Sequence, residues 1–453
     1  MKTRLHRCFT RSPLALNLCA MSAAFVAYFC MYAFRKPFAA GTYEGLSFFG
    51  TDVELKTAFV ICQIFGYAIS KYLGVKFCPE VTRKNRAFLL VALIVAAELT
   101  LMLFAVVPEQ LKVAAIFLNG LSLGMVWGLV VWYLEGRQTS EILLAVLSCS
   151  FIVSSGIVKD VGRLLIRGFT PLGEASIWSL GPVPEFWMPA ATGCVFFLPF
   201  LVAVWLLNQI PEPTQLDRQL RSMRKTMSIE DRLQFVQRYF CGLTMLVIAY
   251  VLFTAFRDFR DNYTVEVLCE LGYEQSVGTI SSMETIIAFF VLGVMALVYF
   301  VKDNQRAMFA ILAIVVVGTL MVGFATLLRQ RGFINGYWWM LAVGLGSYLA
   351  YVPYNSVLFD RLMASTRATG TAVFAIYIAD ALGYTGSVVV QLFNDLIVGD
   401  QSHLEFLENL SYLVSFLGVL LVVGGGSYFL RMPVAVDIAR EEIVPPDAEL
   451  GRS

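Results

Sequence analysis

The stretches Ala27–Arg35 (AYFCMYAFR) and Ala249–Arg257 (AYVLFTAFR) agree at five of nine positions, in the pattern A-Y-x4-A-F-R. Each stretch closes an apolar run with an arginine. The first lies near the start of the chain, and the second lies just past its middle. The repeat therefore predicts two similar halves, each of which opens with the same kind of helix.

The composition places the chain among integral membrane proteins. Of its 453 residues, 58% are hydrophobic and 15% are charged, and the mean hydropathy is +0.71. Soluble domains are about half apolar and about 25% charged. The net charge of +1 indicates no general attraction to nucleic acid.

A membrane-spanning helix needs about 20 mostly apolar residues, and the sequence contains about twelve such runs. In the first half they are Leu14–Phe38, Lys56–Phe77, Ala87–Val107, Leu111–Leu134, Ile142–Ile166 and Trp187–Asn208. In the second half they are Tyr239–Arg257, Ser276–Val301, Ala307–Leu328, Gly336–Phe359, Thr369–Leu396 and Leu404–Leu430. We therefore expect an all-α integral membrane protein of two six-helix halves.

A polar, basic segment separates the two sets of runs. Residues 209–238 contain two prolines and six lysines or arginines, so we expect residues 1–208 and 239–453 to form the two halves and this segment to link them. Lysine and arginine concentrate on the cytoplasmic side of membrane proteins. Counting 21 on the side of the termini and linker against 10 on the other side predicts cytoplasmic termini, in a multi-pass plasma (bacterial inner) membrane protein.

The remaining motifs argue against an enzyme. The nine cysteines are dispersed without a CxxC pair, and only two histidines are present. This pattern favours neither a disulfide framework nor a zinc site. No HExxH, phosphate-binding glycine loop or GxSxG motif occurs, so we expect no metal, no cofactor and no ATP-binding subunit.

The repeated stretches place aromatic and cationic side chains on shared helix faces. Tyr28, Tyr32 and Arg35 are separated by four and three residues, and Tyr250 and Arg257 by seven, which puts each set on one face. A guanidinium offers a planar fork of donors that suits phosphate or carboxylate. Two related helices are thus predicted to aim an arginine at a site between the halves.

The alternative is that these arginines only mark the edge of the lipid. Long cationic side chains can extend to water at the ends of spans. Lys36 follows Arg35 directly, and Asp258 and Arg260 follow Arg257, which favours that alternative. Charge at membrane depth is nevertheless costly and usually functional, so we favour the site.

The segment Tyr28–Ala40 (YFCMYAFRKPFAA) resembles the first helix of the organophosphate:inorganic phosphate antiporters, a family of major facilitator transporters, whose motif is approximately Y-x3-Y-x2-R-K-N-F-A. The segment Phe65–Gly74 (FGYAISKYLG) resembles their second helix and supplies Lys71. Arg257 takes the place of the family's second phosphate-binding arginine. The stretch Ser281–Phe290 (SSMETIIAFF) resembles their eighth helix, with Glu284 as its buried carboxylate.

This resemblance implies the major facilitator fold, with two parallel six-helix repeats around a midplane site. Three departures concern the substrate. Pro37 replaces the motif's asparagine, Phe151 stands where the family's fifth helix has a binding histidine, and Asp380 has no counterpart that we identify.

Further charges occur within the predicted spans. Asp160 and Arg163 lie three residues apart, so they either neutralise each other or contribute to the anion site from the fifth helix. Glu98, Glu284 and Asp380 each need a partner or a proton, because an isolated carboxylate in lipid is expensive. For Glu284 we favour the role of partner to a cation, and for Asp380 both roles stay open; the candidate cations are Arg35, Arg257 and Lys71.

The sequence therefore predicts a secondary active transporter for a small anionic solute, phosphorylated or carboxylated, which works by alternating access with anion exchange or proton coupling. The predicted binding residues are Arg35, Arg257, Tyr28, Tyr32, Lys71, Tyr250 and Arg163, and the predicted coupling or partner residues are Glu284, Asp380 and Asp160. The alternative is a transporter-like membrane sensor of a small anion that contacts a partner through the basic linker.

Overall fold

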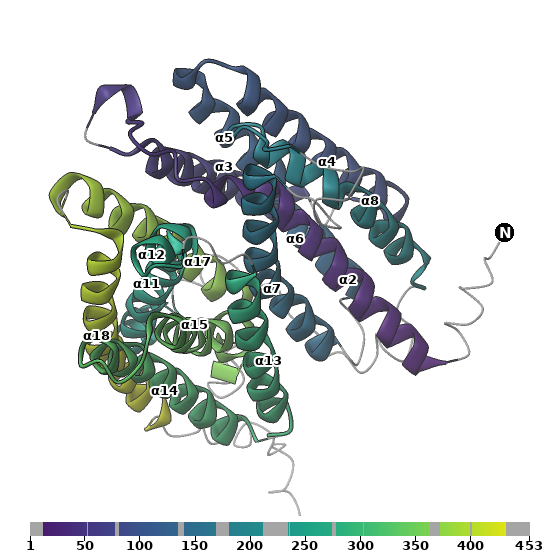
Figure 1. The fold of residues 1–453 in the computed structure, drawn as a ribbon. Coiled ribbons are helices and arrows are strands. Elements are labelled where there is room, and N and C mark those ends of the chain that lie inside the picture. The colour runs from purple at the N-terminus through teal and green to yellow at the C-terminus, as the bar shows by residue number, and fades with distance from the viewer. Residues whose placement is uncertain are drawn as a thin grey trace, which may run out of the picture.

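The computed structural model describes residues 12–51, 53–77, 81–134, 140–168, 181–211, 234, 236–273, 278–301, 303–359, 361–362, 372–398 and 401–431. These residues are nearly all helical and form two groups of helices (Figure 1). Helices α2–α8 make up one group, and α11–α18 make up the other. Most of the predicted linker lies outside the described residues.

Every predicted span corresponds to a helix. The first half contains α2 (Pro13–Arg35), α3 (Leu55–Phe77), α4 (Arg83–Val106), α5 (Glu109–Leu123), α6 (Val126–Leu134), α7 (Ser140–Arg167) and α8 (Met188–Gln209). The second contains α11 (Phe240–Asn262), the short α12 (Thr264–Glu270), α13 (Thr279–Tyr299), α14 (Asn304–Gln330), α15 (Gly336–Pro353), α17 (Ala372–Phe393) and α18 (His403–Leu430). Helices α5 and α6 together match the single predicted span Leu111–Leu134. Within the described residues, 8 spans are long and apolar enough to cross a membrane by length and composition alone.

The first helix of each half ends differently from the prediction. The α-helix α2 stops at Arg35, because Pro37 has no N–H to continue the hydrogen-bond ladder. The chain then continues as a buried 3-10 turn, η1 (Pro37–Ala40). In the second half, α11 was predicted to end at Arg257 but continues to Asn262. Neither arginine therefore lies where the chain leaves the bundle.

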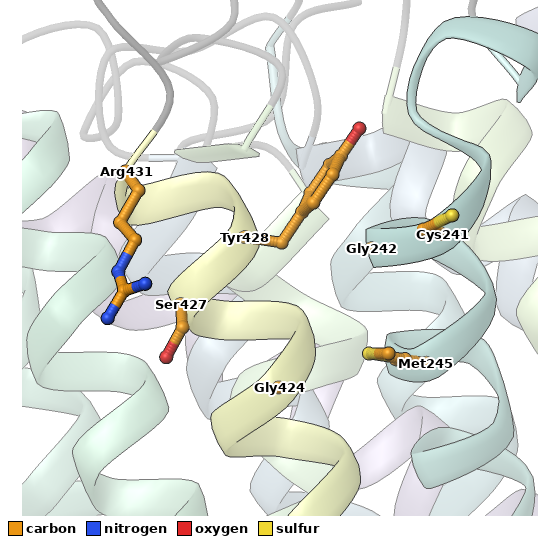
Figure 2. A pocket seen from close by; sticks show the side chains of 7 residues that line it. All are labelled: Cys241, Gly242, Met245, Gly424, Ser427, Tyr428 and Arg431. Carbon is orange, nitrogen blue, oxygen red and sulfur yellow. The ribbon is translucent and has the colours of Figure 1, made fainter.

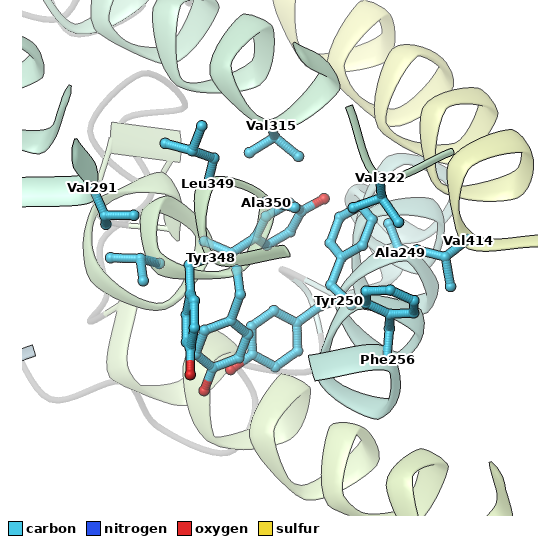
Figure 3. Close-up of a cluster of buried hydrophobic side chains, with 14 of the residues drawn as sticks. Ala249, Tyr250, Phe256, Val291, Val315, Val322, Tyr348, Leu349, Ala350 and Val414 are labelled. Carbon is cyan, nitrogen blue, oxygen red and sulfur yellow. The ribbon is translucent and has the colours of Figure 1, made fainter. Parts of the chain in front are cut away.

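Each half has its own hydrophobic core. One cluster of buried side chains draws on residues between Ala20 and Ile210, and the other on residues from Tyr239 to Phe429 together with Ile152. Figure 3 shows part of the second cluster, in which Tyr250 and Tyr348 lie among aliphatic side chains.

The halves meet along two helix pairs. Helix α7 packs against α13, and α3 packs against α17. Helix α7 is the fifth span of its half and α13 is the second of the other half. Helix α3 is the second span of its half and α17 is the fifth of the other half. The two pairs are thus related by exchange of the halves, as two-fold pseudo-symmetry requires. At the α7–α13 crossing, a Cβ on Gly156 would lie 2.9 Å from the carbonyl oxygen of Ile280, so the close approach needs glycine there.

The directions of the helices define two ends of the bundle. We call the end where α2 and α11 finish and α3 and α18 begin the Lys56 end. We call the opposite end, where α2 begins and α18 finishes, the terminal end. The described residues 41–51 and 53–54 and the π-helical turn Asn394–Val398 also belong to the Lys56 end.

Candidate functional site

Arg35 is buried between the first two spans. Arg35 is 9% exposed, and its Cζ lies 3.9 Å from the centre of the Tyr67 ring of α3. Nη1 lies 3.4 Å from the hydroxyl of Tyr32, and Nε has no hydrogen-bond partner. No carboxylate of the described residues lies within ion-pair distance of this guanidinium. An interfacial anchor would extend to water, whereas Arg35 lies inside the bundle.

Arg257 occupies the equivalent place in the second half. Its Nε and Nη2 donate to Oδ1 of Asp258 at 3.1 and 2.5 Å, and Cζ lies 3.8 Å from the centre of the Tyr351 ring. Both arginines interact electrostatically with Tyr32 and with Tyr384. The repeat thus puts two guanidinium groups, each lying against a tyrosine ring, around the same aromatic side chains.

Lys71 and Asp380 join the halves beside this arginine pair. Nζ of Lys71 lies 3.2 Å from Oδ2 of Asp380 in α17 and 3.4 Å from the hydroxyl of Tyr384. The hydroxyl of Tyr250 donates to the other carboxylate oxygen, Oδ1, at 2.5 Å. Asp380, which the sequence left open between a proton site and a cation partner, is therefore bound to Lys71.

Aromatic rings surround these charges. Tyr28 packs against Trp127 and Tyr32 with ring centres 4.8 and 5.6 Å away. Phe151 of α7 lies 6.4 Å from Tyr32 and 6.3 Å from Tyr348, centre to centre. The position where the resembled family has a histidine thus carries an apolar ring that contacts both halves.

The structure corrects the prediction for Glu284. Its Oε1 lies 2.8 Å from Nη2 of Arg260, so its partner is neither Arg35, Arg257 nor Lys71. Arg260 was expected outside the span, but it is 1% exposed, because α11 continues past Arg257 and turns this side chain toward α13 and α15.

The predicted residues of the fifth span lie at the interface between the halves. Oδ2 of Asp160 accepts a hydrogen bond from the backbone N–H of Ser281, at the start of α13, at 2.7 Å. Arg163 is also buried and interacts electrostatically with Asp160 and Arg167. Asp160 therefore contacts the opposite half directly, which its spacing from Arg163 did not indicate.

A second set of charges closes the Lys56 end. Nζ of Lys36 and Nζ of Lys159 each lie 2.7 Å from a carboxylate oxygen of Asp261, and Lys36 also donates to Asn262 at 2.7 Å. Ser155 donates to the same carboxylate. Two lysines of the first half thus share one aspartate of the second.

Lys56 and Thr57 extend this closure. Lys56 forms an ion pair with Glu266 of α12, and the hydroxyls of Thr57 and Tyr263 lie 2.5 Å apart. Nearby, the backbone N–H of Glu54 donates to Asp395 at 3.1 Å. Burial, and then the carboxylates of Asp395 and Glu266, raise the pKa of Glu54 to about 7.

The sequence did not indicate most of these residues. Tyr67 stands four residues before Lys71, and Tyr384 four residues after Asp380, so helical spacing could have placed each pair on one face. Lys36 and Lys56 lie near the ends of predicted spans, and neither was predicted to bind the other half. Their carboxylate partners, Asp261 and Glu266, lie more than 200 positions away along the chain, and a single sequence contains no signal for such pairs.

Among the described residues, a pocket of about 450 Å3 lies away from these charges. It opens between α11 and α18 at the terminal end (Figure 2). Its lining residues are Cys241, Gly242, Met245, Gly424, Ser427, Tyr428 and Arg431. No group of three or more His, Cys, Asp or Glu side chains able to hold a metal ion occurs in the described part of the chain.

Solved structures resemble the chain over nearly its whole length. The nucleoside transporter NupG matches with a TM-score of 0.59 and 13% identity, over 91% of this chain and 99% of that chain. The D-xylose–proton symporter matches with a TM-score of 0.57 and 15% identity, over 92% and 97%. The inward open conformation of the xylose transporter XylE from E. coli matches with a TM-score of 0.58 and 14% identity, over 91% and 95%. The chain therefore has the major facilitator fold, as its sequence predicts.

Sequence comparison gives one further match. A model of a family of unknown function (DUF5690) matches residues 37–432. No curated protein matches the chain. The narrower likeness to the organophosphate:inorganic phosphate antiporters stays a prediction from the motifs.

Proposed function

Because the chain belongs to the family of unknown function DUF5690 and has the major facilitator fold, we propose that it is a secondary active transporter that moves a small anion across a membrane by alternating access. The solved structures it resembles are described as transporters of nucleosides and of D-xylose. They support transport as the activity. The anionic class of the substrate rests on the charges of this chain alone.

The main support for an anionic substrate is the environment of Arg35. A buried guanidinium without a carboxylate partner is expensive unless an anion reaches it. The ring of Tyr67 covers one face of this group, and Nε has no partner. A planar guanidinium covered on its face still offers its edge, which is the geometry for two-point binding of phosphate or carboxylate.

The charges around Arg35 also favour an anionic substrate. At the two arginines and the Lys71–Asp380 pair beside them, three cations, Arg35, Lys71 and Arg257, stand against two carboxylates, Asp258 and Asp380. An excess of positive charge between low-dielectric walls attracts anions. One carboxylate or singly charged phosphate group would balance it.

The contacts at the Lys56 end fit one state of an alternating-access cycle. Lys36, Lys56 and Lys159 hold the two halves together there, and transport would require these pairs to separate. Exchange against a second anion or coupling to protons would drive the cycle, in line with the sequence prediction.

The experiment is uptake into liposomes that contain the purified protein. Internal phosphate, glycerol phosphate or succinate should drive uptake of the same labelled compound, and Arg35→Lys should weaken this uptake strongly. Arg329→Lys is the matched control, since Arg329 pairs with Glu408 away from the site. If no phosphate ester or organic acid is exchanged, or taken up along a proton gradient, while binding persists, the protein is a sensor; if none binds, the anionic class is wrong.

A further inference from the structure

Lys71 and Arg35 lie against the same tyrosine. Cζ of Arg35 is 3.9 Å, and Nζ of Lys71 is 5.4 Å, from the centre of the Tyr67 ring. Both cations come from the first half, yet the carboxylate of Lys71 belongs to the second. Any anion bound at Arg35 would therefore also attract Lys71, in competition with Asp380.

Asp380 can lose Lys71 without becoming isolated. Its Oδ1 accepts the hydrogen bond from Tyr250, which belongs to the same half. Its Oδ2 accepts from Lys71. The two oxygens are thus divided between a permanent contact within one half and a contact that crosses to the other.

The Lys71–Asp380 pair lies far from the Lys56 end along the bundle, so its loss would affect a separate contact between the halves. Lys71 lies fifteen residues beyond Lys56 on α3, or about 22 Å at 1.5 Å per residue. The Lys56 end and the Lys71–Asp380 pair therefore join the halves at two separate depths. Because α3 and α17 form one of the two packed helix pairs between the halves, a contact here restrains their relative movement.

We propose that Lys71 and Asp380 form an anion-released latch: a phosphate or carboxylate group bound at Arg35 takes Lys71 from Asp380 and so disconnects α3 from α17. The inference rests on the proposed function and deepens it, since it makes Lys71 a ligand of the transported anion and Asp380 a positioning residue. A purely structural ion pair would instead persist when the anion binds.

The test measures the distance between the halves at the terminal end. Spin labels are placed at Phe77→Cys, where α3 ends, and Phe300→Cys, just after α13, in a chain without its native cysteines; both positions are exposed. With wild-type Lys71 and Asp380, saturating inorganic phosphate or succinate should change the ratio of two distance populations by about fivefold or more.

The decisive variant is Lys71→Gln with Asp380→Asn. It removes both charges together, which avoids leaving one buried charge unpaired. Without any anion it should already show the distance distribution of the anion-bound protein, and it should respond no further. The matched control is Arg329→Gln with Glu408→Gln, which removes an ion pair within the second half and should leave the distribution unchanged.

Calorimetry with inorganic phosphate and succinate distinguishes failure of the latch from failure of the proposed function. Binding that is lost in Arg35→Lys, without a distance change in the parent, overturns the latch and leaves the proposed function standing. A double variant whose distribution equals that of the parent without anion also overturns the latch. Failure of the parent to bind either probe overturns the proposed function and the latch with it.

Discussion

Lys56, in the first turn of α3, and Glu266 of α12 form an ion pair between the two halves of the molecule. The lysine is 1% exposed, and its Nζ also donates to the carbonyl oxygens of Ala39 and Gly41, at 3.1 and 2.9 Å. One ammonium thus uses its three donors on the end of η1, on the residue that follows it and on the opposite half. This arrangement makes Lys56 the residue whose loss should affect closure most directly.

We predict that Lys56→Gln opens the Lys56 end. The change leaves the mostly buried Glu266 without its cation, and breaking a fully buried pair costs on the order of 3–5 kcal/mol when nothing relaxes, which is the upper bound here. A cysteine at Thr57, a position that is 0% exposed, should then react faster with a membrane-impermeant maleimide. Adding Glu266→Gln should reverse part of the effect, and equal labelling rates in parent and variant would exclude a closing role for the pair.

We predict that Arg35→Lys and Arg257→Lys each weaken anion binding. Lysine keeps the charge but loses the planar fork, and one lost charge-assisted contact costs about 1.5–3 kcal/mol. This corresponds to roughly ten- to hundredfold in affinity, measured by calorimetry.

The two variants also test whether the arginines act as one site. If they do, the double variant should bind only slightly more weakly than either single variant. Arg329→Lys provides the control for an arginine-to-lysine change at a half-buried position elsewhere. If Arg35→Lys or Arg257→Lys binds the anion as tightly as the parent protein, that arginine has a structural role and does not bind the anion.

We predict that acid favours the closed Lys56 end. The pKa of Glu54 is raised to about 7 there, by burial first and then by the carboxylates of Asp395 and Glu266, against an ordinary value of 4.5. The closed end therefore binds more protons than an opened, hydrated one between these values, and its stability falls as pH rises through that interval. The Glu54 side chain is 51% exposed, so water screens the effect and we expect only part of it.

Labelling of Thr57→Cys at several pH values measures this dependence. The rate should rise between pH 5 and pH 7 more steeply in the parent than in Glu54→Gln, which corrects for the pH dependence of the thiol itself. Identical slopes in the two proteins would mean that Glu54 does not titrate with closure.

We predict that Gly66→Ala and Gly120→Ala impair folding of the first half. A Cβ at Gly66 would lie 2.1 Å from the carbonyl oxygen of Phe117, and a Cβ at Gly120 would lie 2.3 Å from that of Gln63. Helices α3 and α5 pack backbone to backbone here, and overpacking costs about 1–3 kcal/mol. Gly293→Ala is the control, because nothing lies within 4 Å of its Cβ. A melting temperature in detergent as high as that of the control would contradict the close packing.

We predict that both termini and the linker lie in the cytoplasm. Reporter fusions after residues 215 and 440 should both report the cytoplasmic side, because the two halves each contain an even number of spans and lysine and arginine concentrate on that side. A fusion that reports the far side would invert this orientation or change the number of spans between the two points.

The helices could be predicted because their signal is local. Each span is a run of apolar residues, and the order of the runs is enough to indicate twelve spans. The ends of α2 and α11 could not be predicted to the residue. Arg257 pairs with its neighbour Asp258, but Arg260 pairs with Glu284 of α13, and a partner on another helix leaves no signal in the residues around Arg260.

The sequence by itself determined that this chain crosses a membrane, that it consists of two related halves, and that each half presents an arginine beside tyrosines. These properties follow from composition and from spacing along a single helix. Only the tertiary structure decided which charges meet: Lys71 with Asp380, Lys36 and Lys159 with Asp261, and Lys56 with Glu266. The physical reason is that an ion pair between halves requires helices far apart in the chain to be packed first, because the spacing of residues within one helix says nothing about the helix it will face.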